Sequence, residues 1–171
     1  ETVERLQNDA DLLAKMADEL ARREAIEPAT AMARVRTRLY DLAQALGAVP
    51  IPLYQDAVAA EFVFPINNAE VAFAVVEDQE QVDKLLELRA QCPVLAHVWY
   101  DDPRGLRNYG EPGVASLESL IEAGRAHARQ HPDFFDAQVA QADPHDVAAM
   151  FFTSGTTGNP KGVVHTHFSL L

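Results

Sequence analysis

The chain has 171 residues, of which 48% are hydrophobic, and a formal net charge of −12. Such a hydrophobic content is typical of a soluble globular domain or of part of one. Residues 41 to 171 carry seven basic and eighteen acidic side chains, and this charge disfavours binding to nucleic acid or anionic lipid. The sequence shows neither a secretory signal nor an apolar run of about 20 residues, so it predicts a cytoplasmic protein without a transmembrane segment. Peripheral association with a membrane stays open.

Apolar residues recur three and four positions apart over 3–20 and again over 35–46, with Pro28 between the two stripes. This spacing predicts a helical hairpin over residues 1–46 that ends before Gly47. One interpretation is a short coiled coil that dimerises. We favour an antiparallel pair that packs on the body of the protein, because fewer than three heptads precede Glu24.

From Ala48 the pattern changes to short apolar strands that alternate with amphipathic helices. Strands are expected at 48–53, 71–77, 94–100 and 147–152, and helices at about 56–67, at 79–90 and after a cap at Ser116. Pro50 and Pro52 make the first strand irregular, and Pro65 interrupts the first helix. The order of elements predicts an α/β fold with a layered, largely parallel sheet flanked by helices.

A run of Ser, Thr and Gly from Thr153 to Gly158 follows the last expected strand. Hydroxyl groups and unobstructed backbone N–H groups are suited to wrapping anionic oxygens, and Lys161 adds a positive charge. A Walker loop is excluded, because Pro160 precedes the lysine and Gly162 follows it. The segment is therefore predicted to be a different kind of phosphate-binding loop between two strands.

The stretch from Met150 to Lys161 resembles the signature loop of the adenylate-forming superfamily, which includes acyl-CoA synthetases, peptide-synthetase adenylation domains and luciferases. Segments 43–56 and 73–86 resemble the long-chain fatty acyl-CoA synthetases. Residues 1–38 resemble nothing in that family, whose members are several times longer. The resemblance implies that residues 47–171 are an incomplete N-terminal AMP-binding domain that ends just after the phosphate loop, and that the chain is a fragment.

By resemblance, the expected activity is that of an ATP-dependent fatty acid–CoA ligase, which uses ATP, Mg²⁺ and CoA as co-substrate. Lys161 is the expected catalytic residue, and His167, which matches a Thr-His element of the family, is expected beside the acyl-adenylate. The nucleotide phosphates are expected to contact Thr153, Ser154, Gly155, Thr156, Thr157, Gly158 and Lys161. The isolated chain is expected to be inactive, because the groups for adenine, ribose and the acyl phosphate lie outside it.

Two alternatives stay open. In one, the chain is a non-enzymatic interaction module whose helical hairpin recruits a partner. In the other, the same chemistry activates a different carboxylic acid, or delivers it to a carrier protein. The length of the acyl chain and the oligomeric state are not predicted.

The remaining histidines invite metal-binding interpretations. His127 and His131 lie four residues apart on an expected helix, but no third ligand accompanies them, so a solvated helix face is favoured and no metal site is predicted. His165 and His167 would point to one side of a continuing strand. A role for His167 in capping a helix that begins near Thr166 is about as well supported as a substrate contact.

Two further features are interpreted as structural. Cys92 is the only cysteine and has no nearby histidine, so a buried structural thiol is favoured over a reactive one. Trp99 and Tyr100 at a strand end are interpreted as core or rim residues rather than as a stacking platform for a base.

Overall fold

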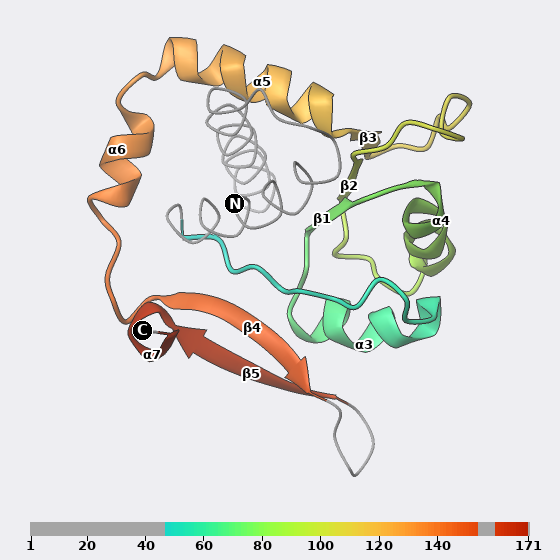
Figure 1. The fold of residues 1–171 in the computed structure, drawn as a ribbon, viewed down its shortest axis with the longest axis horizontal. Coiled ribbons are helices and arrows are strands. Elements are labelled where there is room, and N and C mark those ends of the chain that lie inside the picture. The colour runs from blue at the N-terminus through green and yellow to red at the C-terminus, as the bar shows by residue number, and fades with distance from the viewer. Residues whose placement is uncertain (1–46, 154–159, 171) are drawn as a thin grey trace. The chain divides into compact units, whose positions relative to one another are not determined.

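The computed structural model describes residues 47–153 and 160–170 (Figure 1). The helical hairpin expected over 1–46 lies outside these described residues. The described elements follow in chain order: α3 (Ala59–Asn68), β1 (Phe73–Val76), α4 (Gln79–Leu88), β2 (His97–Tyr100), β3 (Val114–Ser116), α5 (Leu117–Gln130), α6 (Phe134–Val139), β4 (Val147–Thr153), β5 (Lys161–Thr166) and α7 (His167–Leu170).

The described residues divide into two compact units. The first, here called the sheet unit, comprises residues 52–119 together with the 151–153 and 160–163 ends of β4 and β5. The second unit comprises the described parts of 47–51, 120–150 and 164–170. The strands β4 and β5 and the helix α5 each pass from one unit into the other.

A three-stranded parallel sheet in the order β1-β2-β3 forms the centre of the sheet unit. Phe73 pairs with His97, and Val98 pairs with Val114. This arrangement confirms the predicted α/β fold with a parallel sheet. The strand β3 was not expected, because three residues after a Pro- and Gly-rich loop are too few to show an alternating pattern.

One face of this sheet packs against α3 and α4. The amphipathic helix α4 contributes Val82, Leu85 and Leu88, and α3 contributes Phe62 and Ile66, all of them buried. The predicted 79–90 helix is thus confirmed, with its apolar side facing the core. Asp78 caps its first turn by accepting a hydrogen bond from the backbone N–H of Gln81 at 3.3 Å.

Cys92 and Trp99 are both buried, as their structural interpretation requires. Burial raises the pKa of the Cys92 thiol, which disfavours the reactive thiolate. The indole of Trp99 stacks on the rings of Phe73 and His97, with centroids 5.7 and 5.4 Å away. These three rings lie on the sheet face opposite Val98, so Trp99 is a packing residue of the sheet.

The helix expected at about 56–67 exists, and it continues through its proline. It begins at Ala59 and ends at Asn68, with Pro65 inside it and buried. Proline removes one backbone donor, but its carbonyl still accepts a hydrogen bond from Ala69 at 3.0 Å. The proline ring is itself buried in the folded chain.

The prediction of a strand at 48–53 is wrong, because these residues do not pair with another strand. Pro50 and Pro52 have no N–H to donate to a neighbouring strand, so a regular ladder cannot form there. In this stretch the carbonyl of Pro50 accepts a hydrogen bond from the backbone N–H of Met150 at 3.2 Å.

The predicted cap of α5 is confirmed: the Ser116 hydroxyl oxygen accepts a hydrogen bond from the backbone N–H of Ser119 at 3.2 Å. Further along the helix, His131 is exposed, whereas His127 is half-buried with its ring 4.5 Å from that of His131 and 5.6 Å from that of Phe134. The expectation of a solvated face therefore holds for His131 but is wrong for His127. The short helix α6, which begins at Phe134, was not predicted.

Candidate functional site

The segment predicted to bind phosphate joins the neighbouring strands β4 and β5, whose arrows run in opposite directions in Figure 1. The expected strand at 147–152 is confirmed and extends by one residue to Thr153. Lys161 is the first residue of β5. Ser154, Gly155, Thr156, Thr157 and Gly158 lie outside the described residues.

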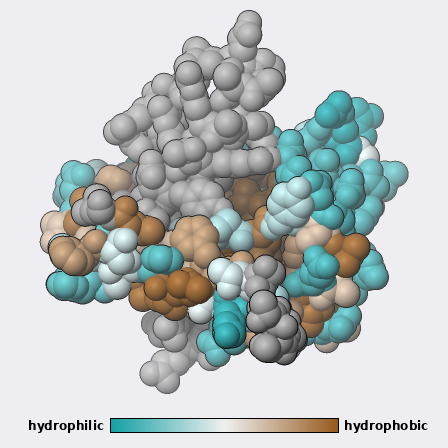
Figure 2. Space-filling model, turned by 60° about the horizontal axis from the view of Figure 1, so that its bottom comes forward, coloured by the Kyte–Doolittle hydropathy of each residue, from teal (hydrophilic) through white to brown (hydrophobic). Residues whose placement is uncertain are grey.

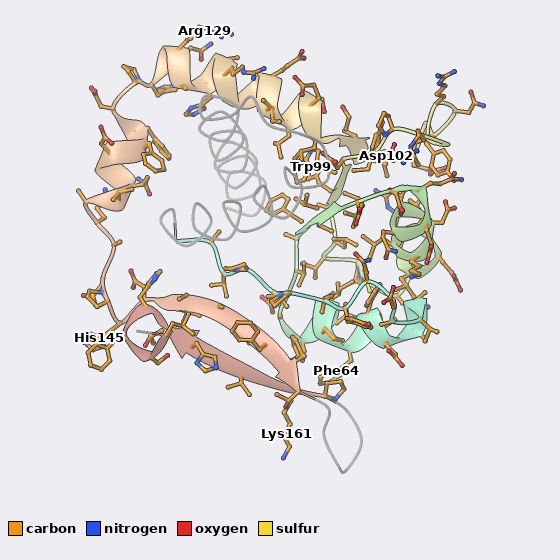
Figure 3. The ribbon with its side chains drawn as sticks, in the orientation of Figure 1. Phe64, Trp99, Asp102, Arg129, His145 and Lys161 are labelled. Carbon is orange, nitrogen blue, oxygen red and sulfur yellow. The ribbon has the colours of Figure 1, made fainter. Side chains whose placement is uncertain are left out.

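Thr153 and Lys161 meet at the base of this hairpin. The Thr153 hydroxyl donates a hydrogen bond to the Lys161 carbonyl over an Oγ1 to O distance of 3.4 Å. Both residues are exposed, and the Lys161 side chain extends away from the hairpin in Figure 3. The two predicted phosphate-contacting residues that the structure describes are therefore adjacent, and the ammonium group of Lys161 is open to solvent.

An aromatic contact connects the hairpin to α3. The ring of Phe152, the residue before Thr153, lies 6.2 Å from that of Phe64 with an interplanar angle of 87°. This edge-to-face geometry is a favoured arrangement of two aromatic rings. Figure 3 shows Phe64 on α3 near the same end of the hairpin as Lys161. Sequence reasoning missed Phe64, because no local pattern indicates a contact between residues so far apart in the chain.

His165 and His167 were expected to point to one side only if the strand continued through both, and the strand does not continue through both. The strand ends at Thr166, and His167 is the first residue of α7. The helix expected near Thr166 is confirmed, but its capping hydrogen bonds come from Thr166 and Ser169. The Thr166 hydroxyl oxygen accepts from the Ser169 N–H at 3.2 Å, and the Ser169 hydroxyl oxygen accepts from the Thr166 N–H at 3.0 Å.

The backbone of His167 is fixed by the turn at 143–146. The carbonyl of Asp146 accepts a hydrogen bond from the N–H of His167 at 3.2 Å, and the carbonyl of Pro144 accepts from Phe168 at 2.8 Å. Within the turn, the Asp143 carboxylate accepts a hydrogen bond from His145 at 2.8 Å. The hydrogen bonds of this turn and those between Thr166 and Ser169 together determine that α7 begins at His167. His167 belongs to the second unit, whereas Thr153 and Lys161 belong to the sheet unit.

Apolar side chains remain at the surface of the hairpin and of α7. Brown, apolar atoms are visible among polar ones on the face shown in Figure 2. The exposed apolar residues of these elements are Val147, Phe151, Val163, Val164, Phe168 and Leu170. The outer surface of the hairpin thus differs from the polar surface usual for an isolated soluble hairpin.

The described site offers donors for an anion rather than ligands for a metal. Thr153 and Lys161 supply a hydroxyl group and an ammonium group. Within 47–153 and 160–170, no group of three or more His, Cys, Asp or Glu side chains could hold a metal ion. Magnesium commonly binds through substrate phosphates, so a nucleotide could bring the ion with it. No helix in the described ranges has both the length and the apolar character needed to cross a bilayer.

Two curated relatives resemble the chain over most of its length. A long-chain-fatty-acid–CoA ligase of Mycobacterium bovis is 31% identical over 127 residues, which are 74% of this chain and 19% of that protein. Human long-chain-fatty-acid–CoA ligase 1 is 31% identical over 134 residues, or 74% of this chain and 18% of that protein. The chain therefore spans about a fifth of the length of these relatives.

Solved structures share the fold. An anthranilate CoA ligase in complex with anthranoyl-AMP superposes with a TM-score of 0.62 and 18% identity, over 92% of this chain and 29% of that one. A fatty acyl CoA synthetase of Mycobacterium tuberculosis superposes with a TM-score of 0.53 and 23% identity, over 92% of this chain and 28% of that one. Residues 43–171, which include the hairpin with Thr153 and Lys161, match the family described as AMP-binding enzyme. The chain therefore belongs to the AMP-binding enzyme family.

Proposed function

We propose that this chain is part of an ATP-dependent fatty acid–CoA ligase and that the segment between β4 and β5 binds the phosphates of ATP. The observation that carries the proposal is the hairpin base, where Thr153 and Lys161 flank a connecting segment made largely of Ser, Thr and Gly. Family membership over 43–171 and the names of the relatives support it.

The proposed reaction has two steps. A fatty carboxylate oxygen attacks the α-phosphorus of ATP, the bond to the β-phosphate oxygen breaks, and pyrophosphate leaves with that electron pair. The CoA thiol, after losing its proton, then attacks the acyl carbon, and AMP leaves as the acyl–oxygen bond breaks. Negative charge grows on the leaving pyrophosphate in the first step, so donors placed around the β- and γ-phosphates lower that barrier.

Each proposed site residue has a role in that first step. Lys161 offsets charge on the leaving phosphates together with a Mg²⁺ ion bound by the nucleotide. Thr153, Ser154, Thr156 and Thr157 donate hydrogen bonds, and the glycines Gly155 and Gly158 allow close approach of the backbone. After Arg129 the sequence has no Lys or Arg other than Lys161 up to residue 171, so this ammonium is the one strong cation that the segment offers. We also propose that His167 lies beside the acyl-adenylate.

The decisive experiment is ATP–pyrophosphate exchange in the full-length ligase that contains this chain. Lys161→Ala is expected to slow exchange by about one to three orders of magnitude, the usual loss for one transition-state charge contact. Arg107→Ala is the matched control, because it removes another exposed cation of the sheet unit, from the loop between β2 and β3. Exchange that is equally fast in the lysine variant and the wild type would remove Lys161 from the mechanism.

The acid substrate is proposed from the relatives and is tested separately. Exchange driven by fatty acids of different lengths is expected to exceed exchange driven by aromatic acids such as anthranilate. A preference for an aromatic acid or an amino acid would be consistent with the proposed adenylation reaction but would contradict a fatty acid as the substrate. Mg·ATP binding that is lost in Lys161→Ala would further separate a ligase from a non-enzymatic interaction module, for which we expect dimerisation that disappears when residues 1–38 are deleted.

A further inference from the structure

We infer that Phe64 is a positioning residue for Thr153 and Lys161 at the base of the hairpin, and that it acts through the ring of Phe152. The inference rests on the proposed function and adds a residue of α3 to it. Three observations lead to it: the orientation of Phe64 on its helix, its contact with the hairpin, and the place of Phe152 in the chain.

Phe64 lies on the side of α3 that faces away from the core. The buried residues Phe62 and Ile66 mark the core side of this helix. Phe64 is two residues from each of them, so at about 100° per residue it lies roughly 160° around the helix from both. It is only half-buried, and it is not part of the apolar cluster between α3, α4 and the sheet. Packing of that core therefore does not explain a large aromatic side chain at this position.

The edge-to-face contact with Phe152 does explain it. Their ring centroids are 6.2 Å apart at 87°, and both residues belong to the sheet unit. The other side of α3 is held by the core, with Ile66 only 1% exposed. The helix is therefore a fixed support, and Phe64 transmits that support to the end of β4.

Phe152 immediately precedes Thr153, which closes the hairpin base through its bond to the Lys161 carbonyl. Thr153 is exposed and that hydrogen bond is long, at 3.4 Å, so it restrains the strand ends weakly. The aromatic contact is one residue away and does not compete with water. Holding the Phe152 ring fixes the backbone of Thr153, the residue that bonds to Lys161 across the hairpin base. Small displacements of such groups cost catalytic rate, because charge stabilisation depends on their distance from the leaving phosphates.

The test compares five variants of the full-length ligase: Phe64→Leu, Phe64→Tyr, Phe152→Leu, the double variant Phe64→Leu/Phe152→Leu and the control Phe62→Leu. Phe64→Leu and Phe152→Leu each remove one ring of the contact, whereas Phe64→Tyr keeps it. Phe62→Leu changes a phenylalanine of the same helix that packs in the core instead. Each ATP–pyrophosphate exchange rate is divided by the fraction of active sites, so that loss of folded protein does not count as loss of catalysis.

We expect the exchange kcat per active site to fall about tenfold in Phe64→Leu and in Phe152→Leu, with the KM for ATP changed less. The double variant should fall no further than either single one, because both remove the same contact. Phe64→Tyr should stay within about twofold of wild type. Phe62→Leu should lower the unfolding midpoint and leave the rate per active site unchanged. Amide hydrogen exchange at Thr153 and Lys161 should quicken in the two contact variants only.

Wild-type rates per active site in both contact variants would overturn the inference. So would an equal loss in Phe62→Leu, since that result would make Phe64 one more structural residue. The variant Lys161→Ala is measured in parallel, because it tests the proposed function separately from the role of Phe64. Slow exchange in Lys161→Ala with normal exchange in Phe64→Leu rejects only the role of Phe64. Normal exchange in Lys161→Ala rejects the proposed function itself.

Discussion

Gly113 has a backbone conformation that other residues rarely adopt. Its φ is +78°, and a Cβ atom added there would lie 2.3 Å from the backbone carbonyl oxygen of Ala96. That carbonyl cannot move aside without disturbing the chain just before β2. The residue therefore combines a left-handed conformation with a close approach of two backbone segments, and both demand glycine.

Gly113→Ala is accordingly expected to lower the free energy of unfolding by about 1–3 kcal/mol. The matched control is Gly110→Ala, because an added Cβ at Gly110 would have no atom within 4 Å. Urea unfolding of the chain, followed by the fluorescence of Trp99, measures both variants. Equal midpoints for the two alanine variants would contradict the strain assigned to Gly113.

At the same scale, the sequence indicated Thr153 and Lys161 as candidate phosphate contacts but not the aromatic contact beside them. Thr153 and Lys161 belong to a compact motif whose composition alone indicates phosphate chemistry, and the structure places them side by side. Phe64 lies in a different part of the chain from Phe152, and only folding brings the two rings together. The role of His167 as the start of a helix depends on Asp146, another contact that no local pattern encodes.

Among the elements, the loop from Asp101 to Gly113 is bound tightly to α4. The Tyr109 hydroxyl donates a hydrogen bond to the Asp83 carboxylate at 2.6 Å, and the Gln79 side-chain amide donates to the same hydroxyl at 2.9 Å. Arg89 donates to the carbonyl of Pro112. Leu106 is buried in the cluster with α4. The connection between β2 and β3 is thereby an ordered part of the sheet unit.

The Tyr109 contact should give this loop an alkaline pH dependence. The hydrogen bond to Asp83 raises the pKa of Tyr109 above its ordinary value of 10.0. Because the folded pKa exceeds the unfolded one, the stabilisation is complete below about pH 10 and is lost as the pH rises through the folded value. Wild type is expected to resist urea better than Tyr109→Phe at neutral pH, with the difference shrinking above about pH 10. A difference that stays constant across that range would contradict the assignment.

Longer elements were predicted better than shorter ones, for a physical reason. The helix α4 repeats its apolar spacing over several turns, so its position is evident from the sequence. The three residues of β3 and the six of α6 complete too few periods to be recognised. Residues 48–53 are mostly apolar, which favoured the prediction of a strand. Two of them are prolines, which have no backbone N–H to donate to a neighbouring strand, so no strand forms.

At the scale of the whole molecule, the chain covers only a small part of the length of its relatives. It spans 19% of the M. bovis relative and 18% of the human one. The motif nevertheless sufficed to predict the family, because a run of Ser, Thr and Gly with a lysine at a fixed spacing is a specific pattern. The acid substrate could not be derived in the same way, since no motif in the sequence indicates a particular acid.

The isolated 171-residue chain is expected to form no acyl-CoA from ATP, CoA and a fatty acid. The described residues supply donors for phosphate, whereas the groups for adenine, ribose and the acyl phosphate are expected outside the chain. Thioester formation is measured by chromatography, with the full-length ligase as the positive control. Turnover by a purified chain free of contaminating ligase would contradict this expectation.

The two prolines that prevent a strand at 48–53 also affect strand pairing between two molecules of the protein. Met150 of β4 donates its N–H to the carbonyl of Pro50. A β-strand of a second molecule approaching this part of β4 would find the Met150 donor occupied, and Pro50 and Pro52 offer no donors in return. Edge-to-edge pairing, the first step towards amyloid-like association, is thereby hindered beside a hairpin that exposes Phe151 and Val164. Replacing both prolines would remove this obstacle to edge-to-edge pairing.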